Sequence, residues 1–360
     1  SQPSITQKEI DCVTDAITSG WVSSLGKYIN EFEKNFASFC NTEYALTTSN
    51  GTAALHLTLV ALGITSGDEV LVPDFTFVST ASAVKYVGAK VVTVDIEEDT
   101  LCIDPKAIEK AITPKTKAII PVHIYGHPAN MEEINKIAKK NNLFVVEDAA
   151  EAHGSEIHGK RVGGLSDAGI FSFYGNKIMT SGEGGMITTN NEELYQKMKR
   201  LRDHAMSENK RYWHEEVGFN YRMTNLQAAL GVAQFDRVDE LLAKKKEIFE
   251  WYKEGLKDIQ GIRLNSQKNG YKNVYWMVCL ELTDYDENKR NEFMNKLKKK
   301  NIDSRPFFYP VSDMPMYDVS DTPITHKISQ RGVNLPSYFD ITKEQVDYIV
   351  TNIKVFIDAR

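Results

Sequence analysis

The feature that most constrains the fold is an alternation of short β-branched runs with amphipathic segments of helical length. The candidate strands are residues 69–72, 90–94, 117–122 and 143–146. Between them lie candidate helices such as residues 76–87 and 131–140. Strands that alternate with helices form βαβ units, whose crossover connections make neighbouring strands parallel. The sequence therefore predicts an α/β fold around a mixed, mostly parallel sheet.

A second, smaller unit is expected toward the carboxyl end. A long charged helix at about residues 236–256 is followed by a candidate strand at residues 274–282 and a lysine-rich helix near residues 291–300. We therefore predict a large domain at residues 1–235 and a smaller C-terminal α/β domain at residues 236–360.

Composition leaves small molecules and other copies of the chain as the expected partners. Charged residues make up 26% of the 360 residues and the net charge is -6, so no basic field is available for nucleic acid or a membrane surface. The four cysteines lie far apart and form no CxxC pair, which argues against a metal site. No apolar run reaches the roughly 18 to 20 residues that cross a bilayer. We expect a cytoplasmic protein with reduced thiols and no metal.

Two residues suggest catalytic chemistry. Asp148 follows a candidate buried strand, at the carboxyl end where open α/β sheets bind ligands. Lys177 lies among small and aromatic residues in a glycine-punctuated stretch, residues 169–190, which favours a loop-rich rim over a helix. A lysine in such surroundings can lose solvation, which lowers the pKa of its amine.

A pyridoxal 5′-phosphate (PLP) cofactor needs an amine that bonds to it and an acid opposite its pyridine nitrogen. Lys177 and Asp148 supply that pair. The phosphate needs an anchor, and residues 49–52 open an apolar helix whose first amides and dipole favour an anion. Ser172 could add a hydroxyl. Each feature alone also fits a structural interpretation: a strand-end cap, a solvated loop lysine and an ordinary helix start.

Ordered motifs carry a resemblance that runs nearly end to end. They are Ser49 to Leu57, Pro73 to Phe77, Glu147 to Gly154, and the stretch through Lys177 to Gly185. The chain resembles the DegT/DnrJ/StrS-type nucleotide-sugar aminotransferases, which implies the aspartate aminotransferase fold, fold type I. Further segments at 212–214, 219–225 and 305–311 are most similar to the GDP-perosamine synthase branch of that family.

The resemblance implies roles at matching positions. Lys177 would bind PLP covalently and shuttle the proton between cofactor and sugar carbon, and Asp148 would pair with the pyridine nitrogen. Phe77 would stack on the ring, Glu151 would lie near the ring hydroxyl, and Asn220 would reach the phosphate of a neighbouring subunit. The phosphate would be held by Gly51, Thr52 and Ser172. The resemblance therefore also implies a homodimer in which each active site is shared between the two chains.

The resemblance also implies substrates, a nucleotide-linked keto sugar and glutamate. Arg211, Tyr212, Trp213 and His214 could grip a diphosphate or stack a base, although an aromatic cluster fits interface packing equally well, and Arg222 is another candidate for substrate binding. Arg305 and Tyr309 are further candidates for substrate contacts. The segment from Asn220 to Thr224 resembles enzymes that aminate C4. A branch with histidine in place of the lysine dehydrates sugars, and Lys177 argues against that activity.

The preferred hypothesis is amination of C4 of a nucleotide-linked 4-keto-6-deoxy sugar. The same chemistry on a UDP- or dTDP-linked sugar, amination of C3, and a non-catalytic sensor or scaffold with this fold remain open. Two other patterns are misleading. Residues 154–160 have P-loop spacing, but Arg161 stands where Ser or Thr should hold magnesium. His123 and His127 lie four apart among prolines and glycine, which favours a structural interpretation over a metal site.

Overall fold

A seven-stranded sheet forms the centre of the larger part of the molecule. The computed structural model describes residues 3–358. All strands run parallel except β9, which is antiparallel to both of its neighbours, so the predicted mixed and mostly parallel α/β sheet is confirmed. In spatial order the strands are β1 (Tyr44–Thr48), β9 (Gly185–Thr189), β8 (Ala168–Ser172), β5 (Phe144–Asp148), β4 (Thr116–Ile119), β2 (Glu69–Pro73) and β3 (Lys90–Val94).

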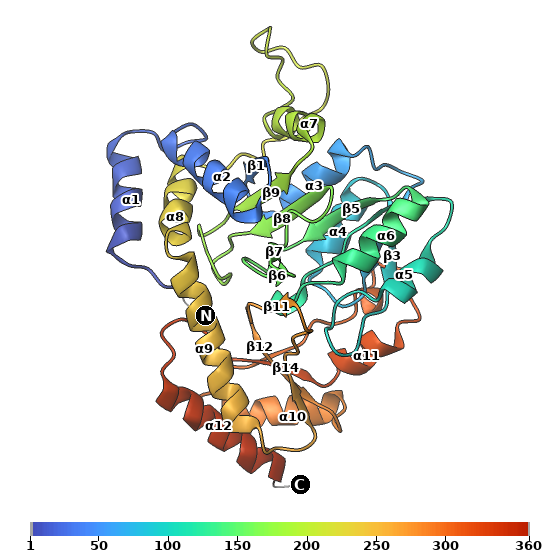
Figure 1. Ribbon diagram of the computed structural model, residues 1–360, viewed down its shortest axis with the longest axis vertical. Helices are drawn as coiled ribbons and strands as arrows, with labels where there is room; N and C mark the ends of the chain where they lie inside the picture. Colours follow the sequence, from blue (N-terminus) through green and yellow to red (C-terminus); the bar gives the residue numbers. More distant parts are fainter. Residues whose placement is uncertain (1–2, 359–360) are drawn as a thin grey trace.

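Helices cover both faces of this sheet (Figure 1). Successive strand residues alternate between the two cores: Val70 packs with one helical layer and Leu71 with the other. One layer contains α3 (Gly51–Ala61), α4 (Ser79–Tyr86) and α7 (Glu192–Arg202). The other contains α2 (Lys27–Cys40), α5 (Pro105–Ala111), α6 (Met131–Asn141) and α8 (Asn225–Phe235), with α1 (Gln7–Thr18) packed on α8. The central strands are therefore buried on both sides.

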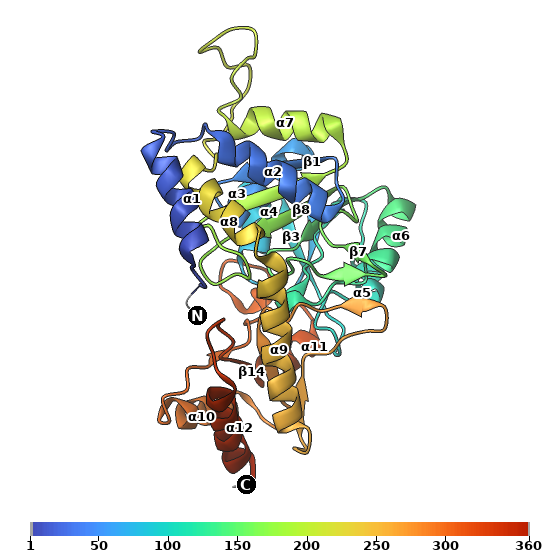
Figure 2. The same cartoon turned by 60° about the vertical axis from the view of Figure 1, so that its left-hand side comes forward.

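A smaller unit follows α9, the helix Val238–Leu256 that leads away from the large sheet (Figures 1 and 2). Its antiparallel sheet has the order β10 (Ile262–Leu264), β12 (Val278–Leu282), β14 (Gly332–Leu335) and β13 (Arg305–Pro306). A separate apolar core joins this sheet to α9, α10 (Glu287–Lys298) and α12 (Lys343–Asp358). The expected strand at residues 274–282 begins only at residue 278, because Tyr275 has φ +51° and interrupts the extended chain.

A returning strap, residues 307–329, lies against the larger part although it follows the start of the small sheet. It contains η2 (Val311–Asp313) and α11 (Pro323–Ser329). Buried Asp74, just after β2, accepts hydrogen bonds from the backbone N and hydroxyl of Ser312 and from the hydroxyl of Thr322. The backbone amide and hydroxyl of Thr325 donate to Asp95. The division at residue 235 remains a prediction.

The shorter elements complete the fold. A three-stranded sheet is built from β11 (Tyr271–Lys272), β6 (Glu156–Ile157) and β7 (Lys160–Arg161), and η1 (Ile124–Gly126) is a single 3₁₀ turn. The segment with P-loop spacing is thus a hairpin. None of the helices in residues 3–358 is long and apolar enough to span a membrane.

Candidate active site

The predicted site residues gather at one edge of the large sheet. Asp148 ends β5, Ser172 ends β8, and Ser49 follows β1. These strands point the same way, with antiparallel β9 between β1 and β8. Carboxyl ends of such strands are where α/β sheets bind ligands.

Asp148 is buried at this edge and is surrounded by neutral hydrogen-bond donors. The hydroxyl of Thr80 donates to one carboxylate oxygen at 2.8 Å, and the backbone N of Ala150 donates to the other at 3.2 Å. Burial raises the pKa of the Asp148 carboxyl, while these two hydrogen bonds and the charge of Lys177 act in the opposite direction. A cationic N–H placed beside this carboxylate would offset the cost of burying it.

Lys177 lies in the loop between β8 and β9, with only 12% of its side chain exposed. Its Nζ is 3.7 Å from Oε1 of Glu151 and 4.0 Å from the centre of the Trp276 ring. Burial lowers the pKa of the amine, while the carboxylates of Glu151 and Asp148 oppose that shift. A lysine held in this way has a larger neutral, nucleophilic fraction at neutral pH than an exposed lysine.

Glu151 is held by an unusual backbone. The amide of Tyr125 donates to its Oε2 at 2.8 Å, and Tyr125 has φ +52°, a left-handed conformation that is strained for a bulky residue. Gly126 follows, and a side chain there would meet Tyr275 and Val274 at 3.0 Å. Burial raises the pKa of Glu151 to about 7, although Lys177 lowers it. The carboxyl can therefore take up or release a proton near neutral pH.

The start of α3 forms a cradle of small groups. Asn50 caps the helix by accepting a hydrogen bond from Ala53 N at 2.8 Å, while the amides of Gly51 and Thr52, which have no acceptor within the helix, can bind an anion. A Cβ on Gly51 would stand 3.1 Å from Cβ of Ser172, so the two residues are adjacent. The hydroxyl of Thr52 donates to that of Ser79 at 3.0 Å. Three hydroxyls and free amides suit a phosphate.

The residues present fit PLP. A buried carboxylate stands where a pyridinium nitrogen needs an acceptor, a buried amine lies near it, and a phosphate cradle opens at the same sheet edge. Asn176 Oδ1 and both ring nitrogens of His153 are buried without a hydrogen-bond partner among the described residues. Phe77 is 55% exposed beside Phe308, with 6.0 Å between ring centres, and offers a flat apolar face.

A groove of about 680 Å³ lies over the small unit. Asn176, the neighbour of Lys177, and Arg305 both line it. The guanidinium of Arg305 lies 3.9 Å from Asp303, and 69% of its side chain is exposed. Tyr309 is 48% exposed, four residues further along the same segment.

The other predicted substrate residues lie elsewhere in this chain. Tyr212, Trp213 and His214 belong to a loop that projects beyond α7 (Figures 1 and 2). At its base Arg222 pairs with Asp203 at 2.6 Å and donates to Asn220 Oδ1 at 2.9 Å. Tyr212 is 77% exposed and Trp213 51%. The fold brings the loop residues near one another and does not bring them to Lys177.

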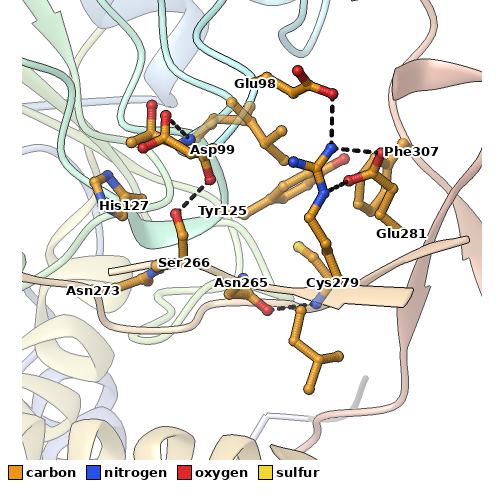
Figure 3. Close-up of a pocket in the computed structure, with 15 residues that line it drawn as sticks. Glu98, Asp99, Tyr125, His127, Asn265, Ser266, Asn273, Cys279, Glu281 and Phe307 are labelled. Atoms are coloured by element: carbon orange, nitrogen blue, oxygen red, sulfur yellow. Dashed lines mark hydrogen bonds and ion pairs between the residues drawn. The ribbon is translucent and has the colours of Figure 1, made fainter. Parts of the chain in front are cut away.

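A second cavity, of about 190 Å³, lies at the junction between the two units (Figure 3). Arg263 of β10 bridges Glu98 of the large part and Glu281 of β12, with N–O distances of 3.0 and 2.7 Å. Tyr125, whose amide binds Glu151, forms part of the cavity wall. The ion pairs of Arg263 with Glu98 and Glu281 therefore link the two units at this cavity.

His123 and His127 both make hydrogen bonds within the fold. His123 contacts Glu147 at 3.1 Å and accepts a hydrogen bond from Ala129 N, while His127 contacts the carbonyl oxygen of Pro128. Among residues 3–358 no group of three or more His, Cys, Asp or Glu side chains is arranged to hold a metal ion.

The sequence prediction missed Thr80, Tyr125 and Trp276. Thr80 lies in an ordinary amphipathic helix, and nothing in its surroundings distinguishes it. Tyr125 precedes a glycine and lies between His123 and His127, which is a weak signal for a strained turn. Trp276 belongs to the small unit and contacts the backbone of Asn176, 100 residues away.

Comparison with known proteins supports one interpretation of this geometry. Residues 3–354 match the model of the DegT/DnrJ/EryC1/StrS aminotransferase family. A GDP-perosamine synthase from Escherichia coli O157:H7 is 44% identical over 357 residues, 99% of this chain and 97% of that protein. One from Caulobacter vibrioides is 43% identical, covering 97% of this chain and 95% of that protein.

Solved structures agree. A Streptococcus pneumoniae protein assigned as a sugar aminotransferase has a TM-score of 0.95 in both its PMP form and its PLP form, at 28% identity. All of this chain is covered, with 97% and 98% of the two matched chains. The predicted fold of PLP-dependent aminotransferases is therefore confirmed.

Proposed function

The chain belongs to the DegT/DnrJ/EryC1/StrS family of PLP-dependent sugar aminotransferases, and from that premise we propose that it aminates C4 of a nucleotide-linked 4-keto-6-deoxy sugar. The cofactor is PLP, which alternates with its amino form PMP. Glutamate is the proposed amino donor and a GDP-linked sugar the proposed acceptor. The observation that carries the proposal is the buried Lys177 amine between Glu151 and Trp276, close enough to Asp148 for their charges to interact.

The proposed roles follow from the contacts. Bound PLP supplies an electron-withdrawing ring that carries the amino group from donor to acceptor. Asp148 would hold the pyridine nitrogen protonated, since its carboxylate is buried and otherwise meets only neutral donors. Gly51, Thr52 and Ser172 would bind the phosphate, and Phe77 would cover one ring face.

Proton transfer is assigned to Lys177 and Glu151. The Lys177 amine, with its lowered pKa, can take a proton from the reacting carbon and return one to it. Glu151, whose pKa is raised to about 7, lies 3.7 Å from Nζ and can hold a proton beside that amine. Both pKa values move toward neutrality, where exchange of a proton costs least.

The identity of the sugar rests on the relatives and on the groove. The two relatives described above are GDP-perosamine synthases at 43 and 44% identity over nearly the full chain. The groove of about 680 Å³ is large enough for a nucleotide sugar and offers the exposed guanidinium of Arg305 for a phosphate or hydroxyl. Tyr309 would contribute a further hydroxyl contact.

A homodimer with shared sites is proposed from the projecting loop. Tyr212, Trp213 and His214 belong to the loop that projects beyond α7, with Asn220 and Arg222 at its base, and Tyr212 and Trp213 are largely exposed. We assign them to the site of a second copy. Co-expressing Lys177→Ala with Asn220→Ala chains should then restore part of the activity that each variant lacks alone, because mixed dimers contain one intact site.

Incubation of the holoenzyme with glutamate and a panel of GDP-, UDP- and dTDP-linked 4-keto-6-deoxyhexoses, with products identified by mass and NMR, tests the proposal. We expect turnover of the GDP sugar with a new amine at C4. A product aminated at C3, or turnover of another nucleotide only, would replace the substrate assignment. Lys177→Ala should abolish multiple turnover, while exposed Lys136→Ala should leave it unchanged.

A further inference from the structure

Trp276 brings the small unit into the candidate active site. It lies two residues before β12 and is 4% exposed. Its indole N–H donates to the backbone O of Asn176 at 2.8 Å. The face of the same ring lies 4.0 Å from Nζ of Lys177. One side chain therefore fixes the backbone next to Lys177 and also covers its amine.

Contacts with α9 hold the backbone of Trp276 and the side chain of its neighbour Tyr275. Lys245 of α9 is buried and donates to the carbonyl O of Trp276 at 3.0 Å and to that of Ser337 at 2.5 Å. Tyr275 has φ +51°, and its ring stacks on Phe249 of α9 with 3.8 Å between ring centres. A strained backbone that persists in a packed surrounding is a feature of functional sites. These contacts leave the indole little freedom to move away from Lys177.

We propose that Trp276 is a positioning residue that receives the amine of Lys177 whenever that amine is not bonded to PLP, and that Lys245 holds Trp276 in place for this task. The inference rests on the proposed role of Lys177. An aromatic face attracts a cation through its ring quadrupole, and the attraction grows where water is excluded. Trp276 thereby stabilises the protonated amine without adding a second carboxylate.

The groups facing Nζ give the direction of the effect. Glu151 and Asp148 favour the protonated amine, and burial favours the neutral one. His153, whose pKa burial lowers to about 3, is neutral. Lys245 lines the same small cavity as Lys177, and burial lowers its pKa to about 8. Replacing the indole by an apolar side chain removes an attraction for the protonated amine, so the pKa of Lys177 should fall.

The test measures how the full-length enzyme captures PLP after its cofactor has been removed, over a range of pH, by absorbance in the near ultraviolet and visible. Only the neutral amine bonds to the cofactor, so the capture rate rises through the pKa of Lys177. For Trp276→Leu we expect the midpoint to fall, so that capture below the midpoint is about threefold faster or more. Trp276→Phe keeps a ring face and should lie between Leu and wild type.

The control is Trp251, which is partly buried against the core of the small unit and whose ring centre lies 4.4 Å from Nζ of Lys244. Trp251→Leu removes a similar cation contact and should leave the midpoint unchanged. Lys245→Met should shift the midpoint in the same direction as Trp276→Leu and add nothing in the double variant, because it acts through Trp276.

Equal midpoints for wild type, Trp276→Phe and Trp276→Leu would overturn the inference. If the Leu variant does not fold by circular dichroism, the comparison of Phe with wild type decides alone. Failure of the proposed function would give a different result: the Lys177→Ala variant would then show the same absorbance spectrum after PLP is added as the wild type. A normal wild-type midpoint that the Trp276 variants do not move overturns only the positioning role.

Discussion

Replacing Asp74 by alanine should loosen the returning strap that brings Tyr309 to the site. The Asp74 side chain is fully buried just after β2 and accepts hydrogen bonds from Ser312 N at 2.8 Å, from Ser312 Oγ at 2.7 Å and from the hydroxyl of Thr322. These contacts span 238 to 248 residues of sequence. In Asp74→Ala the three donors lose their acceptor while they remain buried.

The size of the effect follows from those three contacts. A hydrogen bond to a charged acceptor contributes about 1.5 to 3 kcal/mol, and each buried donor left without a partner costs about 1 to 3 kcal/mol. Since water can enter once the strap moves, we expect the free energy of unfolding to fall by about 4 kcal/mol. With a urea m-value of about 3 kcal/mol/M, the unfolding midpoint should move by about 1.3 M.

The Asp74→Ala substitution should raise the KM for the nucleotide sugar more than it lowers kcat. Tyr309, a proposed substrate contact, lies within the strap and Arg305 lies just before it, so the KM for the nucleotide sugar should rise about tenfold, while kcat for the sugar at saturation changes less. Asp104→Ala is the matched control: Asp104 caps α5 by accepting a hydrogen bond from Lys106 N at 2.9 Å. It should cost only about 1 kcal/mol and leave the KM unchanged. A loss below 1 kcal/mol with an unchanged KM in Asp74→Ala would refute the reasoning.

Three further predictions concern individual groups. Burial raises the pKa of Glu151 to about 7, so the stability that its protonated carboxyl contributes is fully present below 4.5, the pKa in the unfolded chain, and is lost as pH rises through 7. Glu151→Gln should therefore narrow the difference between the urea unfolding midpoints at pH 5 and pH 8. An unchanged difference would contradict this. Gly51→Ala places a Cβ 3.1 Å from that of Ser172, so PLP affinity should fall about tenfold in a fluorescence titration while urea stability changes by less than about 1 kcal/mol. Glu9 has its pKa lowered to about 2, with hydrogen bonds from Thr6 overcoming the opposing effect of burial, so its stabilisation is present above pH 4.5 and lost as pH falls through 2; Glu9→Gln should reduce the acid dependence of the urea midpoint between pH 5 and pH 3.

The fold and the sheet-edge residues could be predicted because their signals are local. A β-branched run followed by a carboxylate places Asp148 at a strand end, and that end is where the structure has it. The start of α3 could also be predicted from the sequence, because asparagine is a favourable N-cap residue and Asn50 is followed by Gly51 and Thr52. Strand ends and helix starts depend on neighbours in sequence, so the periodic pattern carries most of the information.

Contacts between distant segments could not be predicted in the same way. The expected strand at residues 274–282 is shorter because Val274 N donates to Gly126 O, a contact that depends on the tertiary fold, and Tyr275 N then donates to the side chain of nearby Asn273. The projecting loop was predicted to bind substrate from its residue types, but only the fold shows that it projects beyond α7. The type of a residue indicates which chemistry its side chain can perform, but it does not indicate which binding pocket the side chain lines.

The two units of this protein contribute different kinds of residue to the candidate active site. Groups that would react or bind the cofactor, such as Lys177 and Asp148, lie at the edge of the large sheet. Groups that hold them in place come from later in the chain: Trp276 covers the amine, and Ser312 ties the strap to Asp74. Substitutions in the first set should abolish turnover, since they remove a reacting group. Those in the second should shift a pKa or a KM and leave the reaction intact, so sugar preference can change through the small unit while the sheet-edge motifs stay constant.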